Sequence, residues 1–380
     1  AEDPVLLNGL RASTSFLLLL IPATAMGMTL PLLTRALCAI EPRFGKVLGN
    51  LYGFNTIGAM AGVIATEAVL VHVLGIRGSA LFAGAIDAGV ALCALGLSRR
   101  AQPLEPLERP AFELGPVAPL LGAAFVAGFG ALALEVVWFR FLLLYVNGTA
   151  ETFAVMLAIV LGGIAGGGWL AARWLAGDPR AHRHAPALLL LMSFFCAMGY
   201  LASPLLVAWL PNGRAYAWID VVRMGLPLML PVALASGCFF TLVGTALRDE
   251  IGSEAATTGA LTLANTIGAG LGSLAGGFML LPWFGIEGCF FTIGVLFALA
   301  GAGLAFSRRS PAKPTGLVAG LAAVPLVLFP HGSMVDFHYG VQKIRYGGEI
   351  DATREGLTET IVYLRTSLED EVVHHRMLTN

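Results

Sequence analysis

Long runs of uncharged apolar residues recur along this chain, and they restrict its fold more than any other feature. Each run is about as long as the ~20 residues that an α-helix needs to cross a bilayer. The runs are continuously apolar, whereas strands of a membrane β-barrel alternate apolar and polar residues. The sequence therefore predicts an all-α polytopic membrane protein with about ten transmembrane helices. We expect spans near 12–34, 47–74, 78–98, 116–146, 151–176, 186–210, 219–247, 255–282 and 287–306, and a short tenth span at 315–330.

Composition supports the same class. The chain has 380 residues, of which 57% are hydrophobic and only 12% are charged. Soluble globular proteins carry about 25% charged residues, and their cores stop growing beyond ~250–300 residues. An ordinary soluble enzyme, a disordered chain and a nucleic-acid-binding protein are therefore excluded, and the expected partner is the lipid bilayer. The five cysteines lie in apolar runs without a CxxC pair, so we expect small buried hydrophobes.

The loop charges predict the orientation. Alternate loops (35–46, 99–115, 173–184, 248–254 and 307–314) contain 13 Lys and Arg residues, and the opposite loops contain three. Cytoplasmic loops carry an excess of Lys and Arg. The first set is therefore expected in the cytoplasm, and the N-terminus of this chain is expected to face outward. The chain is therefore expected to be a multi-pass membrane protein.

An internal repeat divides the membrane part. Gly49–Gly78 (the first copy) aligns without gaps on Gly259–Gly288 (the second copy), with 13 of 30 positions identical. Both copies have the same loop-charge orientation, which predicts parallel repeats of the major-facilitator type. Three helices, roughly ninety residues, would then precede Ala1, so the first repeat is expected to be incomplete.

The expected domains follow from the repeat and from the charge distribution. Residues 331–380 hold 13 of the 47 charges, which separates a water-facing tail from the membrane part. We expect a first membrane repeat at 1–98, a cytoplasmic linker at 99–115, a second repeat at 116–306, a linker with a possible last helix at 307–330, and the β-stranded tail at 331–380.

Ionisable and amide side chains inside the spans are the candidate functional residues. Such residues are costly in a bilayer and often mark transport paths or proton relays. Interhelical polar pairing and interfacial snorkelling are the alternatives. The acidic Glu67 has a glycine, Gly277, at the equivalent position of the other copy, so it is not a shared packing residue. The candidates are Glu135, Arg140, Glu67, Asp87, Asn55 and Asn265.

Glycines spaced four residues apart predict close helix packing, because they let two helix backbones approach. A sliding surface in a transporter is the alternative. Two prolines fall in the first span (Pro22 and Pro31) and two in its repeat partner (Pro227 and Pro231), and the related bends fit either a lined cavity or static packing. The packing glycines are Gly58, Gly62, Gly162, Gly166, Gly268, Gly272 and Gly276.

Catalytic, metal and cofactor motifs are not found. His374 and His375 are adjacent, and His182 and His184 lie in a loop, so neither pair has the spacing of a metal site. Gly162–Gly168 is glycine-rich but lies inside a membrane helix, so it does not predict a phosphate cradle. We therefore assign no catalytic residue, no metal and no cofactor within these residues.

The tail changes its periodicity. The β-branched and aromatic residues of 359–365 predict a strand, Gly347-Gly348 predicts a turn, and 375–380 begins another extended stretch. If 315–330 spans the membrane, the tail faces outward. If 315–330 is interfacial, the tail is cytoplasmic.

Several motifs together resemble those of bacterial fused membrane spermidine-synthase-like proteins. They are Gly128–Arg140 (GFGALALEVVWFR), Gly162–Gly168, Gly27–Leu33, and the tail segments Arg354–Thr360 and Met377–Asn380. The resemblance implies a multi-pass protein of the bacterial inner (cytoplasmic) membrane. It also implies a major-facilitator-like membrane region followed by a polyamine aminopropyltransferase-like domain that uses an S-adenosyl ligand. That domain would follow the tail, so no residue of this sequence receives an aminopropyltransferase role.

Three functions remain open. The resemblance implies the membrane portion of a spermidine-synthase-like protein, which anchors or serves a transferase-like domain. The repeats, the paired prolines and Glu135 are typical of a transporter of a small amine or related solute. The glycine-rich faces also fit a non-catalytic structural subunit that packs against other membrane subunits.

Overall fold

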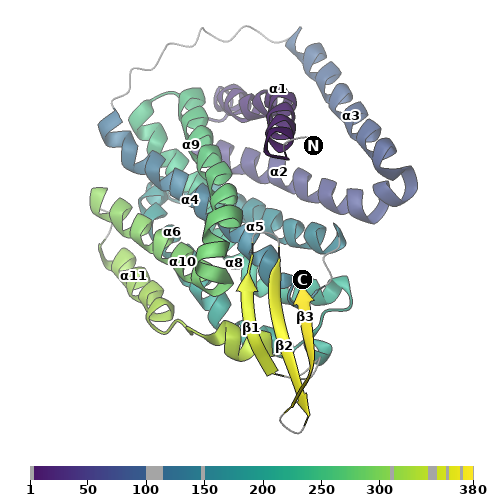
Figure 1. The fold of residues 1–380 in the computed structure, drawn as a ribbon. Coiled ribbons are helices and arrows are strands. Elements are labelled where there is room, and N and C mark those ends of the chain that lie inside the picture. Colours follow the sequence, from purple (N-terminus) through teal and green to yellow (C-terminus); the bar gives the residue numbers. More distant parts are fainter. Residues whose placement is uncertain are drawn as a thin grey trace.

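The computed structural model describes residues 4–99, 114–146, 150–308, 312–340, 349–356, 359–368 and 371–379. A bundle of long helices carries a small antiparallel sheet at one end (Figure 1). The α-helices are α1 (Pro4–Cys38), α2 (Phe44–Ala65), α3 (Val71–Ser98), α4 (Leu114–Leu142), α5 (Ala150–Gly177), α6 (Ala185–Leu201), α7 (Ser203–Ala208), α8 (Trp218–Ile251), α9 (Glu254–Ala275), α10 (Leu281–Ser307) and α11 (Ala312–Val327).

Shorter elements join these helices and form the tail. The 3₁₀ segments are η2 (Pro179–His184) and η3 (Pro211–Gly213), and the π-helical turns are η1 (Thr66–Leu70), η4 (Gly276–Leu280) and η5 (Met334–His338). The strands are β1 (Glu349–Glu355), β2 (Thr360–Leu368) and β3 (Glu371–Thr379).

Seven helical stretches in the described part of the chain are long and apolar enough to cross a membrane. This supports a multi-pass membrane protein, but the number differs from the ten expected spans. Two of the seven stretches, Phe44–Ser98 and Glu254–Ser307, each contain two of the expected spans, and α11 has only 16 residues. Each long stretch bends at a glycine with positive φ (Gly75 at 66° and Gly285 at 67°), a conformation that glycine adopts without strain. The stretch from α2 to α3 therefore changes direction (Figure 1).

The same backbone irregularities recur in the two copies of the repeat. The helices α2 and α9 have 22 residues each, and a π-helical turn follows each of them, η1 and η4. The two glycine bends, Gly75 and Gly285, occupy equivalent positions in the alignment of the copies. The two copies therefore resemble each other in backbone conformation as well as in sequence.

The buried core lies mainly among the helices from α4 to α10. Helix α5 packs against α8 and α2, α4 against α9, and α6 against α10. In contrast, the most apolar windows of α1 and of the α2–α3 stretch are 0% buried, compared with 67% for α8. Apolar side chains such as Leu18, Ile21 and Leu81 are therefore exposed on α1 and α3.

The tail forms a three-stranded antiparallel sheet with the order β1-β2-β3. Val362 of β2 pairs with Thr353 on one side and Leu378 on the other, and the side chain of Val362 is buried. The strand expected at 359–365 thus lies largely in β2, and the extended stretch expected from 375 lies in β3. The turn expected at Gly347-Gly348 lies outside the described residues. The start of the tail contains the π-helical turn η5. This turn packs against the bundle and buries Met334 and His338.

Candidate functional site

Polar groups gather at both ends of the bundle and in one cavity between them. Helix α10 shows that the two ends are opposite: Ile286 near its start bonds to the sheet, and Arg308 just after its end bonds to Glu250. We name the end with Arg308 the charged end, since the described basic residues of loops 35–46, 173–184 and 248–254 also lie there. The opposite end, which carries the sheet, is the tail end (Figure 1).

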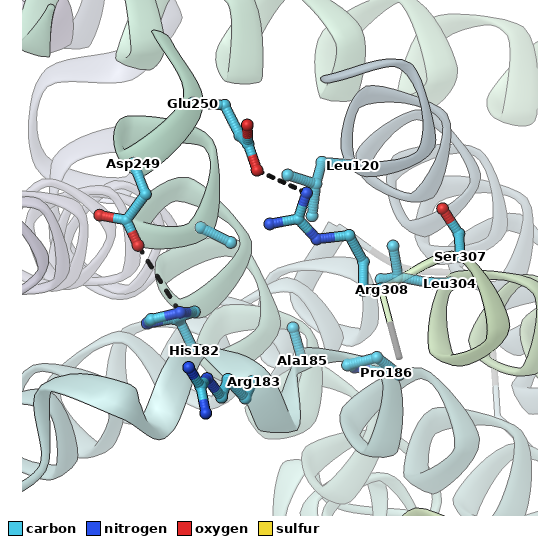
Figure 2. Close-up of a pocket in the computed structure, with 11 residues that line it drawn as sticks. Leu120, His182, Arg183, Ala185, Pro186, Asp249, Glu250, Leu304, Ser307 and Arg308 are labelled. Atoms are coloured by element: carbon cyan, nitrogen blue, oxygen red, sulfur yellow. Dashed lines mark hydrogen bonds and ion pairs between the residues drawn. The ribbon is translucent and has the colours of Figure 1, made fainter. Parts of the chain in front are cut away.

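A cavity of about 710 Å³ opens at the charged end between α4, η2, α6, α8 and α10 (Figure 2). Two carboxylates near the end of α8 line it. Glu250 accepts a hydrogen bond from Arg308 at 2.6 Å, and Asp249 lies 3.6 Å from His182. Carboxylates are unfavourable near the C-terminus of a helix, so a basic partner from another element stabilises each of them. Polar contacts thus join the helix ends around this cavity, and both of its carboxylates already have partners.

A second cavity, of about 780 Å³, lies between α2, η1, α3, α5 and α8, and we name it the interhelical cavity. Most of its lining is apolar, from residues such as Met60 and Leu230. Its ionisable groups are Glu67 in η1, His72 in α3 and Glu151 in the first turn of α5. A mostly apolar cavity with two carboxylates suits an organic cation, because the carboxylates attract the charge while the walls cover the carbon chain. π-Helical turns such as η1 are frequent at functional sites.

Polar side chains at the tail end bind the tail to the bundle. We name them the tail network, and its central members are Glu287, Glu355, Arg140 and His338. Glu287, two residues after the bend at Gly285, accepts three hydrogen bonds. Its carboxylate receives the backbone N–H of Gly332 at 2.7 Å, the backbone N–H of Met334 at 2.8 Å and the Tyr200 hydroxyl at 2.9 Å. One carboxylate on α10 therefore orders the loop that leads from α11 into η5.

The end of β1 is held to the same helix. Glu355 accepts a hydrogen bond from the backbone N–H of Ile286 at 2.6 Å and another from the Tyr339 hydroxyl at 2.7 Å. The N–H of Ile286 follows the bend and belongs to a new helical segment, whose N-terminal end favours a negative charge. Arg140 of α4 donates to the carbonyl oxygen of Gly356 at 2.9 Å. Burial nevertheless raises the pKa of Glu355 above its usual value.

His338 forms the buried centre of the tail network. Its ring is fully buried and contacts the ring of Phe141 edge-on. Ser203 uses its hydroxyl proton to donate to the carbonyl oxygen of Tyr200 at 2.6 Å, so it must accept from His338 Nε2, 3.0 Å away. His338 Nδ1 then accepts from the hydroxyl of Tyr145. Both ring nitrogens are satisfied by the neutral ring, and burial lowers the pKa of His338 to about 4.

The predicted ionisable residues are dispersed. Arg140 is buried and reaches the tail network, whereas Glu135 lies half-buried on the same helix without a hydrogen bond to any described residue. Glu67 is half-buried in the interhelical cavity. Asp87 lies exposed on α3. The structure therefore does not unite these residues in one site.

The two equivalent asparagines lie in different surroundings. Asn265 is half-buried, and its backbone oxygen lies against Gly128 of α4. Asn55 is exposed. No hydrogen bond of either side chain to another described residue is found.

The predicted packing glycines also divide into two groups. A Cβ atom at Gly268, Gly272 or Gly276 would approach the backbone of α4 within about 2.0–3.1 Å. At Gly162 it would approach the sulfur atom of Met60 to 3.1 Å. The remaining predicted glycines have no neighbour within 4 Å of such an atom: Gly58, Gly62 and Gly166.

Sequence reasoning missed most of the tail network. One signal was present, because Glu287 replaces Arg77 of the other copy directly after the shared bend. A carboxylate at a helix start that lacks a counterpart in the repeat indicates a local partner. Nothing in the local sequence indicated the partners of Glu287, since Tyr200, Gly332 and Met334 come from other segments of the chain.

Comparisons of the chain with models of protein families, with curated proteins and with solved structures find no match. The resemblance to spermidine-synthase-like membrane proteins therefore rests on the motifs of this sequence alone.

Proposed function

We propose that this chain is the membrane portion of a spermidine-synthase-like protein and that it anchors or serves a polyamine aminopropyltransferase-like domain. The tail network is the observation that carries the proposal. The tail is held to the bundle at four separate points. Glu287 and Arg140 of the bundle bind Gly332 and Gly356 of the tail, and Glu355 and His338 of the tail bind Ile286 and Ser203 of the bundle. A tail held in this way presents the β-sheet in one fixed orientation, as an anchor for a further domain requires. No residue in 1–380 has a catalytic role in this proposal.

Two parallel major-facilitator-like repeats and an inner-membrane location belong to the same proposal. The matching π-helical turns and glycine bends in the two copies support the repeats. The tail end lies opposite the loops that are rich in Lys and Arg. By the positive-inside rule the tail then faces outward.

Glu287→Gln is expected to release the tail from the bundle. The amide offers one acceptor oxygen where three donors converge, so it leaves donors unpaired. Spin labels at Met377→Cys in β3 and Trp209→Cys after α7, both exposed positions, report the distance between sheet and bundle in lipid vesicles. The exposed Cys93 and the half-buried Cys38 are replaced by serine in this background.

We expect one narrow distance distribution for the parent chain and a broad one for Glu287→Gln. Glu250→Gln is the matched control, because it makes the same change at the charged end, and it should leave the distribution narrow. A broad distribution in the parent chain would contradict anchoring. An open reading frame that continues past Asn380 without a nucleotide-binding domain would contradict the transferase-like part.

The second candidate function is a carrier of a small amine, and the interhelical cavity favours it. Glu67 and Glu151 supply the negative charge and the apolar walls supply the covering surface. Glu67→Gln should reduce uptake of a radiolabelled polyamine into vesicles by about tenfold, as expected for the loss of one charge pair of ~1–2 kcal/mol. Asp87→Asn, an exposed acidic residue outside the lining, should not change uptake. Equal uptake by the parent chain and Glu67→Gln would exclude this role for the cavity.

A further inference from the structure

Three glycines on α1 and α2 face open space. A Cβ atom built on Gly27, Gly58 or Gly62 would meet no other atom within 4 Å. Apolar side chains beside them, such as Met28 and Phe54, are exposed by more than half. We name this surface the open glycine face. The face alone does not show which kind of molecule covers it. The internal repeat does, because the equivalent glycines of the second copy have neighbours.

Helix α9 shows what covers the equivalent of Gly58 and Gly62. Their counterparts in the second copy are Gly268 and Gly272, and both lie against the backbone of α4. A Cβ atom on Gly268 would lie 2.1 Å from the carbonyl oxygen of Phe125, and one on Gly272 would lie 2.0 Å from that of Phe129. The glycines are therefore required for the close approach of α4 to α9.

The counterpart of Gly27, at the same offset along the chain, shows the same relation to α5. A Cβ atom on this counterpart, Gly237 of α8, would lie 2.1 Å from the carbonyl oxygen of Ile164. Across the same contact, one on Gly167 would lie 2.1 Å from the carbonyl oxygen of Leu234. In the second half of the chain, α4 and α5 thus fill the positions that remain open beside α1 and α2.

The contact between the two halves gives an independent observation. Helix α5 packs on α2 as well as on α8, and a Cβ atom on Gly49 would lie 2.6 Å from the carbonyl oxygen of Gly168. The counterpart of Gly49 is Gly259 of α9, which has no neighbour within 4 Å. Helix α5 covers both Gly237 and Gly49, whose counterparts are Gly27 and Gly259. A helix that lay against Gly27 in the same way would therefore also cover Gly259. The open positions on α1 and α9 therefore indicate the same helix.

We propose that the open glycine face binds two further apolar transmembrane helices, placed against α2 and α1 as α4 and α5 are placed against α9 and α8. The face is unsuited to a second copy of this chain in the same arrangement, because α4 and α5 of each copy are already occupied by α9 and α8. Lipid chains would cover the apolar side chains, but they offer no rigid backbone to fit the glycine positions. This inference does not depend on the anchoring or carrier functions.

The test uses the full chain in phosphatidylcholine vesicles and a synthetic peptide with the sequence of α4, Leu114–Leu142, as the probe. An acceptor dye on the exposed Cys93 of α3, in a Cys38→Ser background, reports the approach of a donor-labelled peptide. The expected result is saturable energy transfer with one peptide per chain, weakened at least tenfold by Gly62→Leu. Gly89→Leu is the matched control, because its counterpart, Leu299, is already a leucine and is 67% exposed. The control should leave peptide binding unchanged.

Three outcomes would overturn the proposal. Energy transfer that rises linearly with peptide concentration would show that lipid covers the face. Saturable transfer of equal strength in Gly62→Leu would place the peptide elsewhere. Dimers of the chain that form without peptide and disappear in Gly62→Leu would identify a second copy as the occupant.

Discussion

Gly272→Leu should prevent α4 from packing on α9, whereas Gly62→Leu, the same change at the equivalent position of the other copy, should leave the fold of the chain intact. At Gly272 the first side-chain atom would lie 2.0 Å from the carbonyl oxygen of Phe129. A backbone carbonyl inside a helix cannot turn away as a flexible side chain can. Overpacking of a core typically costs ~1–3 kcal/mol, and for Gly272→Leu we expect a loss of at least ~3 kcal/mol.

Thermal unfolding in detergent, followed by helical circular dichroism, measures both variants. Gly62→Leu should unfold within a few degrees of the parent chain, because a Cβ atom there meets no neighbour within 4 Å. Gly272→Leu should be extracted in low yield or unfold well below the parent. A similar loss of stability in both variants would show that α2 already has a neighbour like α4 within the chain.

Acidification from pH 7 to about 4 should loosen the tail end through His338. Its pKa is lowered from 6.5 to about 4 in the folded chain by burial. Between these two values the unfolded chain binds a proton that the folded chain does not. The stabilisation is therefore complete above the unfolded pKa and is lost as the pH falls towards the folded one. The slope is about 1.4 kcal/mol per pH unit for one such proton.

His338→Gln isolates this effect, because glutamine keeps polar atoms near Ser203 and Tyr145 but does not titrate in this range. Glu355 acts in the opposite direction, since its raised pKa favours the folded chain as the pH falls. The measured quantity is therefore the difference between parent and variant in unfolding temperature from pH 7 to pH 4. The variant should lose less stability than the parent. Parallel pH profiles would exclude His338 as the source.

The helices and the location of charge were largely predictable, because both depend on local composition. Apolar runs and Lys- and Arg-rich loops predicted a multi-pass helical protein, and seven long apolar helices support that class. The count of ten was less predictable. Gly75 and Gly285 each place a bend between two expected spans within one long helical stretch, and this bend depends on a single φ angle in each case.

The candidate sites were much less predictable. Hydropathy marks Glu67 as an ionisable residue inside a span, and the structure adds the cavity around it. Arg140 was selected for the same reason, but its bond to the distant Gly356 depends on how the tail folds back. His338 was not selected, because a single histidine in a polar tail gives no local signal of burial.

Local sequence is enough to predict that the chain is helical and multi-pass, that two of its segments repeat each other, and that the tail contains strands. These properties follow from hydropathy, periodicity and residue identity, which can be evaluated over short windows. The packing of distant helices sets which glycines are covered, since Gly62 and Gly272 have matching local sequences, yet only Gly272 lies against another helix. It also decided that the tail binds α4 and α10, because hydrogen bonds between distant segments depend on the packing of the whole bundle.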